Sequence, residues 1–171
     1  MLVRSTPLSR YSACRNGSAP RFLSAFAFSG LLGGGASRSR RSAGVIRERI
    51  TPGHESDLPF WVRQSDFIFE TLGESIDLKC RYYRAIDEHR RPGTIVATCS
   101  SGLSVAALCE GMSEDFRKHF LAVHLYNPPS KLTAVEVVPG PDTLPGVVEF
   151  VEKLMREQYR RAVLRAQDVP G

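Results

Sequence analysis

The sequence predicts an α/β fold in which helices flank a mostly parallel sheet. Short apolar runs of strand length alternate with longer segments whose apolar residues recur at helical spacing, and this order holds from residue 57 to residue 164. The chain has 171 residues, of which 42% are hydrophobic and 24% charged, so it is long enough to bury one full-sized core. We therefore expect one globular domain.

The first predicted elements lie between residues 57 and 89. A short helix is predicted from Asp57 to Val62, with Asp57 as its N-cap and a proline in its first turn. Phe67–Phe69 is typical of a short buried strand. An amphipathic helix begins at residue 75 or 77 and ends at His89, before a Pro-Gly turn.

The remaining elements continue the alternation. They are the strand Thr94–Ala97, the helix Leu103–Met112, the strands Lys118–His124 and Thr133–Val138, a helix from Asp142, its expected cap, to Tyr159, and the closing strand Ala162–Leu164.

Charge divides the chain into two parts. Residues 1–47, the leader, contain eight arginines, no lysine and no acidic residue, whereas residues 48–171, the body, carry 15 basic and 18 acidic side chains. The net charge of +5 is thus +8 in the leader and −3 in the body. An Arg- and Ser-rich, acid-free start is typical of a mitochondrial transit peptide. The alternatives are a disordered extension or a sequence artefact, and the expected location is the mitochondrial matrix or the cytoplasm accordingly.

The body's composition excludes several classes of function. It has no basic stripe with interleaved aromatic residues, which argues against nucleic-acid binding. No apolar run approaches the roughly 18 residues that suggest a membrane span. The four cysteines have no CxxC spacing and no matched histidines, so we expect neither a metal site nor disulfides, and a reducing compartment.

A histidine and a glutamate twelve residues apart are the candidate catalytic pair. His124 ends one apolar run and Glu136 lies inside another, with an Asn-Pro-Pro turn between them. An imidazole can take a proton from an alcohol at neutral pH, and a carboxylate can fix its tautomer and stabilise the imidazolium. Alcohol oxidation by hydride transfer needs such a base, although an isolated His and Glu are more often surface residues.

Four segments in order resemble the NAD-binding domain of the L-3-hydroxyacyl-CoA dehydrogenases of fatty-acid β-oxidation. They are Asp66–Lys79 (DFIFETLGESIDLK), Thr94–Val105 (TIVATCSSGLSV), His124–Glu136 with the family's twelve-residue separation, and Arg161–Pro170 (RAVLRAQDVP). The motifs RITPG (49–53), EDFRKH (114–119) and VPGPDT (138–143) are most similar to long bacterial members that also carry enoyl-CoA hydratase activity. The resemblance covers about 120 residues and implies a Rossmann-like domain.

The resemblance also implies a reaction and roles for individual residues. The implied activity is NAD-dependent oxidation of L-3-hydroxyacyl-CoA to 3-oxoacyl-CoA, with His124 as base. Ser101 would contact the substrate hydroxyl beside the nicotinamide, and Asn127 would contact the cofactor or position His124. Glu74 and Lys79 would line the cofactor site near the nicotinamide ribose. Without the resemblance, Ser101 is equally a helix cap, Asn127 a turn residue, and Glu74 and Lys79 solvent-exposed.

The chain departs from the family in several places. It has no Gly-x-Gly-x-x-Gly motif, and the glycine-rich segment Gly30–Gly35 lacks that spacing. The chain stops where the family's helical domain would begin, Cys99 replaces the usual asparagine, and Tyr126 replaces the usual phenylalanine. We therefore expect a partial Rossmann-like domain without the first βαβ glycine motif, in a fragment of a larger enzyme.

Two other possibilities stay open. The chain could be a catalytically silent remnant that binds acyl-CoA or a partner protein, with homo- or hetero-association through surfaces that the missing parts leave exposed. Alternatively, the chain as written does not fold stably.

Overall fold

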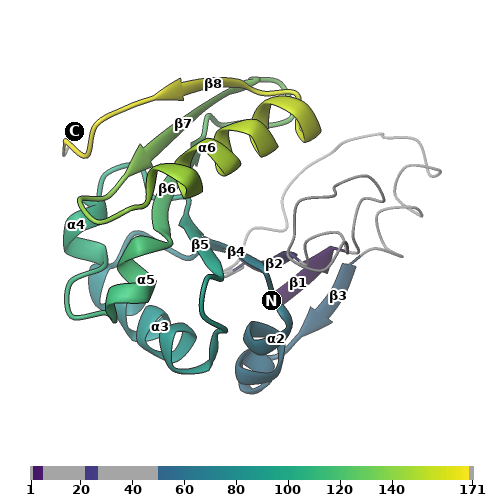
Figure 1. Ribbon diagram of the computed structural model, residues 1–171. Coiled ribbons are helices and arrows are strands. Elements are labelled where there is room, and N and C mark those ends of the chain that lie inside the picture. Colours follow the sequence, from purple (N-terminus) through teal and green to yellow (C-terminus); the bar gives the residue numbers. More distant parts are fainter. Residues whose placement is uncertain (1, 6–21, 27–49, 170–171) are drawn as a thin grey trace.

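A computed structural model of the chain describes residues 2–5, 22–26 and 50–169, and within them eight strands form one sheet. The sheet order is β3-β1-β2-β4-β5-β6-β7-β8 (Figure 1). The strands are β1 Leu2–Ser5, β2 Phe22–Phe26, β3 Ile50–Gly53, β4 Phe67–Thr71, β5 Ile95–Thr98, β6 Phe120–Leu125, β7 Ala134–Pro139 and β8 Ala162–Arg165.

The sheet is mostly parallel in its centre, which confirms the predicted α/β class. Strands β2, β4, β5 and β6 run parallel to one another, β7 runs antiparallel to β6, and β8 pairs parallel with β7. Strand β1 pairs antiparallel with both β2 and β3. The leader thus contributes two strands to this sheet. Its other residues, including Gly30–Gly35, lie outside the described part of the chain, so the domain boundary at residue 47 stays a prediction.

Helices cover both faces of the sheet. Figure 1 shows α3, α4 and α5 on one side and α6 on the other. The helical segments are η1 Glu55–Asp57, α2 Leu58–Gln64, α3 Ile76–His89, α4 Val105–Leu108, α5 Glu114–Lys118, α6 Pro145–Lys153 and the π-helical turn η2 Leu154–Gln158.

The core is divided by the sheet into two layers, because successive strand residues point to opposite faces. Ile68, Val96 and Phe120 pack with residues of α2 to α5, on what we call the α3 face. Their neighbours Phe67 and Leu121 pack with residues of α6 and η2 on the opposite face, the α6 face. The central strands are therefore almost continuously apolar in sequence, because both of their faces are buried.

Of two predicted helix caps, Asp57 keeps its position without making the capping bond, and Asp142 is wrong. Asp57 stands at the N-cap position of α2, but its Oδ2 accepts from the backbone N of His54 at 2.9 Å instead of capping the helix. Asp142 accepts from Nε of Arg117 at 2.7 Å, and α6 begins only at Pro145. A tertiary contact thus takes Asp142 away from α6, whereas Asp57 has a local partner three residues earlier.

The predicted helix over residues 103–112 is also shorter than expected. Only Val105–Leu108 is α-helical, and its N-cap is Ser104. The helix start is further bound by Asp168, whose carboxylate accepts from the backbone N of Val105 at 2.8 Å and of Ala106 at 2.9 Å. It also accepts from Oγ of Ser104 at 2.9 Å. The end of the described chain is thereby fastened to α4.

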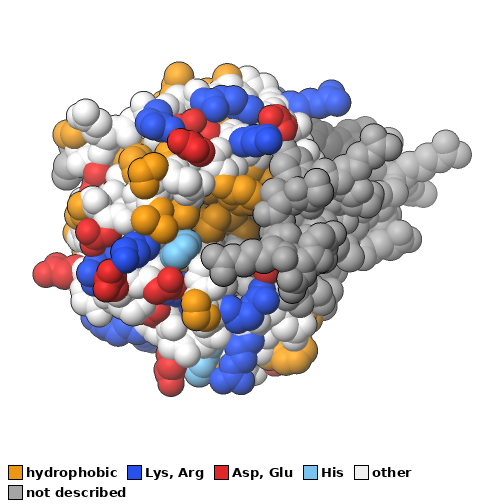
Figure 2. Space-filling model, viewed as in Figure 1, with side chains coloured by type: hydrophobic (Ala, Val, Ile, Leu, Met, Phe, Trp, Pro, Cys, Tyr) orange, Lys and Arg blue, Asp and Glu red, His pale blue; other side chains and the backbone are white. Residues whose placement is uncertain are grey.

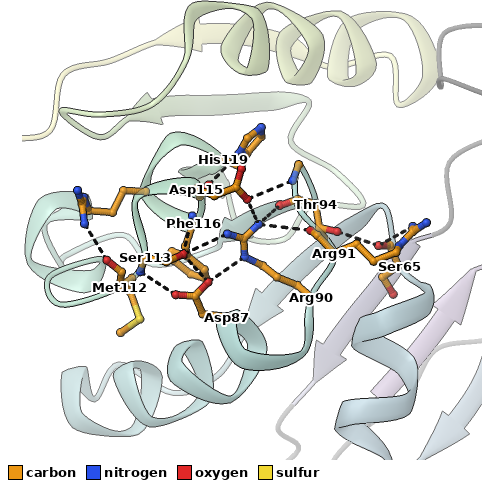
Figure 3. Close-up of polar contacts among 12 residues, drawn as sticks. Ser65, Asp87, Arg90, Arg91, Thr94, Met112, Ser113, Asp115, Phe116 and His119 are labelled. Carbon is orange, nitrogen blue, oxygen red and sulfur yellow. Dashed lines mark hydrogen bonds and ion pairs between the residues drawn. The ribbon is translucent and has the colours of Figure 1, made fainter.

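A buried arginine joins the end of α3 to the start of α5 (Figure 3). The Arg90 side chain is 3% exposed, and its guanidinium bonds Asp115 at 2.6 Å and Asp87 at 3.2 Å while lying over the ring of Phe116. Asp87 also accepts from the backbone N of Ser113 at 2.7 Å. We call these residues the Arg90 cluster; it lies at the amino end of β5, away from the carboxyl ends of the parallel strands.

The described surface shows mixed charge. On the face seen in Figure 2, lysine and arginine side chains are interspersed with acidic ones. None of the helices within residues 50–169 combines the length and the apolar character that crossing a membrane requires.

Candidate active site

The predicted site residues gather at one edge of the sheet. Since β4, β5 and β6 are parallel, their carboxyl ends meet at this edge, where α/β sheets bind ligands. Glu74 follows β4, Ser101 follows β5, and His124 lies near the end of β6 with Asn127 just beyond. Glu136 joins them from β7, because that strand returns antiparallel from the same edge. We call this the carboxyl edge.

His124 and Glu136 are direct partners across the β6–β7 ladder. Nδ1 of His124 lies 3.1 Å from Oε2 of Glu136, and the two side chains are 25% and 30% exposed. Since an ionised carboxylate can only accept, Nδ1 is the donor and Nε2 is left as the acceptor nitrogen of the ring. This is the tautomer that a general base for a hydroxyl proton requires.

Tyr126 binds the second oxygen of Glu136. Its hydroxyl donates to Oε1 at 2.5 Å, and its ring lies 5.3 Å from that of His124. The bond from Tyr126 and then that from His124 hold the pKa of Glu136 below its usual value, and the same carboxylate raises the pKa of Tyr126. The sequence marked Tyr126 only as a departure. Its position two residues after His124 puts it on the same side of the chain, which was the available signal.

Ser101 and Glu74 connect two loops at the carboxyl edge. Oε1 of Glu74 accepts from the backbone N of Ser101 at 3.2 Å, and Oε2 accepts from Oγ of Ser100. Ser101 is exposed, and α4 is capped by Ser104, so the alternative that Ser101 caps this helix is wrong. The loop after β4 and the loop after β5 are thus fixed to each other.

Lys79 lies inside the fold instead of on a solvated helix face. It is 1% exposed, and its Nζ lies 2.9 and 3.1 Å from the two carboxylate oxygens of Glu70 and 3.1 Å from the carbonyl oxygen of Leu72. The structure does not bring its ammonium to the surface of the carboxyl edge. Sequence reasoning missed Glu70, although a carboxylate at the end of an apolar strand needs a buried partner.

Asn127 begins the exposed loop between β6 and β7. Arg161, which directly precedes β8, binds this loop: its Nη1 donates to the carbonyl oxygens of Pro129 at 2.7 Å and Leu132 at 2.8 Å. Cys99, at the end of β5, is half-buried, and burial raises the pKa of its thiol. Within the described residues, no group of three or more His, Cys, Asp or Glu side chains could hold a metal ion.

The carboxyl edge presents polar side chains that could hold a cofactor. Glu74, Ser101 and Asn127 offer a carboxylate, a hydroxyl and an amide there, which are suited to ribose hydroxyls and a carboxamide. In a Rossmann-like sheet the strand beside the fourth is the first, and the turn after it holds the pyrophosphate. Here β2 takes that place beside β4, and the residues that follow it lie outside the described part of the chain.

Comparison with known proteins agrees with this geometry. Residues 35–169 match the family model described as "3-hydroxyacyl-CoA dehydrogenase, NAD binding domain". A Bacillus subtilis protein named "Probable 3-hydroxyacyl-CoA dehydrogenase" is 35% identical over 122 residues, which are 71% of this chain and 16% of that protein. The 5-formyl-3-hydroxy-2-methylpyridine 4-carboxylate 5-dehydrogenase of Mesorhizobium japonicum is 32% identical over 130 residues, 76% of this chain and 40% of that protein.

A solved structure shows the same fold. The crystal structure of 3-hydroxybutyryl-CoA dehydrogenase from Escherichia coli K12 aligns with a TM-score of 0.60 at 24% identity, over 64% of this chain and 23% of that chain. The chain therefore spans less than half the length of these relatives. Through the NAD-binding domain that it matches over residues 35–169, the chain belongs to the 3-hydroxyacyl-CoA dehydrogenase family.

Proposed function

We propose that this chain carries the base and the nicotinamide-side residues of an enzyme that oxidises L-3-hydroxyacyl-CoA to 3-oxoacyl-CoA in fatty-acid β-oxidation. The observation that carries this proposal is the bond between Nδ1 of His124 and Oε2 of Glu136. It leaves Nε2 to accept a proton at the carboxyl edge, where open α/β sheets bind ligands. Family membership supports the cofactor and the reaction class.

In the proposed reaction the substrate loses a proton from its hydroxyl and a hydride from C3. Bound NAD supplies the hydride acceptor. Nε2 of His124 takes the proton, and the negative charge of Glu136 stabilises the imidazolium that forms. The hydroxyl of Ser101 orients the substrate oxygen towards His124. The products are a 3-oxoacyl-CoA, NADH and one proton, which leaves from His124.

Residues at the carboxyl edge have a second proposed task, which is to hold the cofactor. Glu74 would accept hydrogen bonds from ribose hydroxyls, and the amide of Asn127 would bind the cofactor or hold the His124 ring. Lys79 would support this site from within the fold without touching the cofactor, since its ammonium is buried and bound to Glu70. Each contact contributes binding energy that orients the reacting atoms.

The test is consumption of NADH by the purified chain with acetoacetyl-CoA. Turnover by the wild-type chain and its loss in His124→Ala would support the proposal. The matched control is His119→Ala, because His119 is also half-buried and immediately precedes β6, but at the opposite edge of the sheet. Equal turnover in His124→Ala and the wild type would contradict the role of His124.

The alternative from a different class is a silent remnant that binds acyl-CoA or another protein. Exposed apolar side chains near the end of the chain, Leu164 and Val169, favour association. A cooperatively melting chain that binds no NADH but self-associates in sedimentation would favour this alternative over the enzyme.

A further inference from the structure

Four polar side chains are buried together beneath the carboxyl edge. Glu70, Lys79, Tyr83 and Thr98 are each at most 1% exposed, and we call them the Glu70 cluster. They come from β4, α3 and β5, so the cluster joins three elements on the α3 face. Buried charges are costly unless they are paired and hydrogen-bonded, and these groups supply one another's partners.

The carboxylate of Glu70 is the centre of the cluster. Lys79 bonds both oxygens at 2.9 and 3.1 Å, Oγ1 of Thr98 donates to Oε2 at 2.8 Å, and the hydroxyl of Tyr83 donates to the same oxygen. Burial, followed by the nearby carboxylate, raises the pKa of Tyr83, which therefore stays a neutral donor. The Glu70 carboxylate is thus held from three directions and cannot rotate freely.

The cluster reaches the loop after β4 through Leu72. The backbone N of Leu72 donates to Oε1 of Glu70, and its carbonyl oxygen accepts from Nζ of Lys79 at 3.1 Å. The backbone N–H and the carbonyl oxygen of Leu72 are therefore both bound by buried charged side chains. Glu74 lies two residues further on, at the carboxyl edge.

The cluster reaches the loop after β5 through Thr98. Oγ1 of Thr98 donates to Glu70 and accepts from the backbone N of Ser100 at 3.2 Å. The backbone N of Cys99 donates to the carbonyl oxygen of Glu70 at 2.9 Å. Ser101 is the next residue along, and its own backbone N bonds Glu74.

We propose that Glu70 is a positioning residue, whose buried carboxylate holds the loops that present Glu74 and Ser101 in one fixed arrangement. This inference rests on the proposed function, since those two residues would contact cofactor and substrate. Lys79 then acts as the counter-charge of Glu70 and as a clamp on Leu72, without touching the cofactor. A buried ion pair is weak evidence for stability, so fixed geometry is the better account of this one.

Thr98 offers the sharpest test, because Thr98→Val removes the hydroxyl while keeping the shape of the side chain. The matched control is Thr94→Val at the other end of β5, since Thr94 is also buried and its Oγ1 donates to the carbonyl oxygen of Ser65 at 3.2 Å (Figure 3). Thr98→Ser restores the hydroxyl. Each full-length variant is compared with wild type by hydrogen exchange and by NADH fluorescence.

In Thr98→Val we expect amide exchange in peptides spanning residues 99–104 and 71–76 to rise about fivefold or more, as loss of a buried hydrogen bond implies. The Kd for NADH should rise by a similar factor. Thr94→Val should leave both readouts near wild type, and Thr98→Ser should return them towards it. Unchanged exchange in Thr98→Val, or an equal rise in both valine variants, would overturn the inference.

The experiments distinguish a failure of the proposed dehydrogenase function from a failure of the positioning role of Glu70. If the wild-type chain binds no NADH, the proposed dehydrogenase role of this chain fails. The exchange measurement still decides whether Glu70 and Thr98 hold the two loops, because it needs no cofactor. Glu70→Gln should raise exchange in the same peptides. If Glu70→Gln does not fold, the Thr98→Val measurement remains decisive.

Discussion

Glu136 lies opposite His124 in the β6–β7 ladder, and its two carboxylate oxygens are divided between His124 and Tyr126. One oxygen fixes the imidazole and the other is held by the phenol. The carboxylate therefore has a single orientation. Its charge is placed to stabilise a proton on His124.

Glu136→Gln should lower kcat far more than it weakens NADH binding. The amide keeps the size of the side chain but removes the charge that stabilises the imidazolium, so we expect kcat to fall by about 100-fold. Steady-state kinetics and fluorescence titration separate the two effects. Glu149→Gln, which removes an exposed carboxylate from α6, should leave both values unchanged. Unchanged kcat in Glu136→Gln would exclude the assigned role.

Glu136 should also make stability depend on pH. Its pKa is lowered in the folded state, chiefly by Tyr126 and then by His124. The stabilisation is therefore complete above the ordinary glutamate pKa of about 4.3 and is lost as pH falls through the lowered value. The difference in Tm between wild type and Glu136→Gln should therefore shrink as the pH falls below about 4. A difference that stayed constant or grew between about pH 4 and pH 2 would contradict this.

Tyr126→Phe should raise the pKa of Glu136 towards its ordinary value, since the bond from Tyr126 is the main cause of its lowering. The substitution introduces the residue that is usual in the family, so the His124–Glu136 pair should persist. Carbon-detected NMR titration of the glutamate carboxyl groups measures the change. An identical titration curve for Glu136 in both proteins would show that the phenol contributes nothing.

Asp168→Ala should destabilise the fold by about 1–2 kcal/mol, the range observed for loss of a helix cap. The carboxylate binds the first two backbone N–H groups of α4 and the hydroxyl of Ser104. Urea denaturation measures the loss. Gln167→Ala, at the exposed neighbouring position, is the control and should stay near wild type. Equal stabilities for the two variants would mean that the Asp168 contacts add nothing.

Arg90→Met should cost about 2–4 kcal/mol, because it leaves Asp87 and Asp115 without the buried cation that pairs them. Denaturant titration of the free energy of unfolding gives the value. Lys118→Met breaks an exposed pair with Glu114 and should cost much less. Comparable losses would indicate that the Arg90 cluster is no stronger than a surface ion pair.

Local sequence patterns predicted most of the body's elements. The strands over residues 67–69, 94–97 and 162–164 agree with β4, β5 and β8 to within a few residues, and the helix ending at His89 agrees with α3. These elements follow from apolar periodicity and from turn residues, which act over a few positions. The start of α6 was less predictable, because Asp142 found a partner outside the helix that it was expected to cap.

The sequence also indicated which residues to examine at the site. The separation of His124 and Glu136, with a turn between them, was visible in the chain, and the ladder places them directly opposite. Lys79 was different. Its helix position alone predicted exposure, and only the approach of β4 to α3 put Glu70 beside it.

The sequence by itself thus determined the alternation of strands and helices, the charge division between leader and body, and the candidate pair His124 and Glu136. Tertiary structure alone decided the strand order, the partner of Lys79 and the contact of Asp168 with a helix more than 60 residues earlier. The reason is physical. Periodicity and turn chemistry are local, whereas a buried charge takes whichever partner the packing of distant segments brings to it.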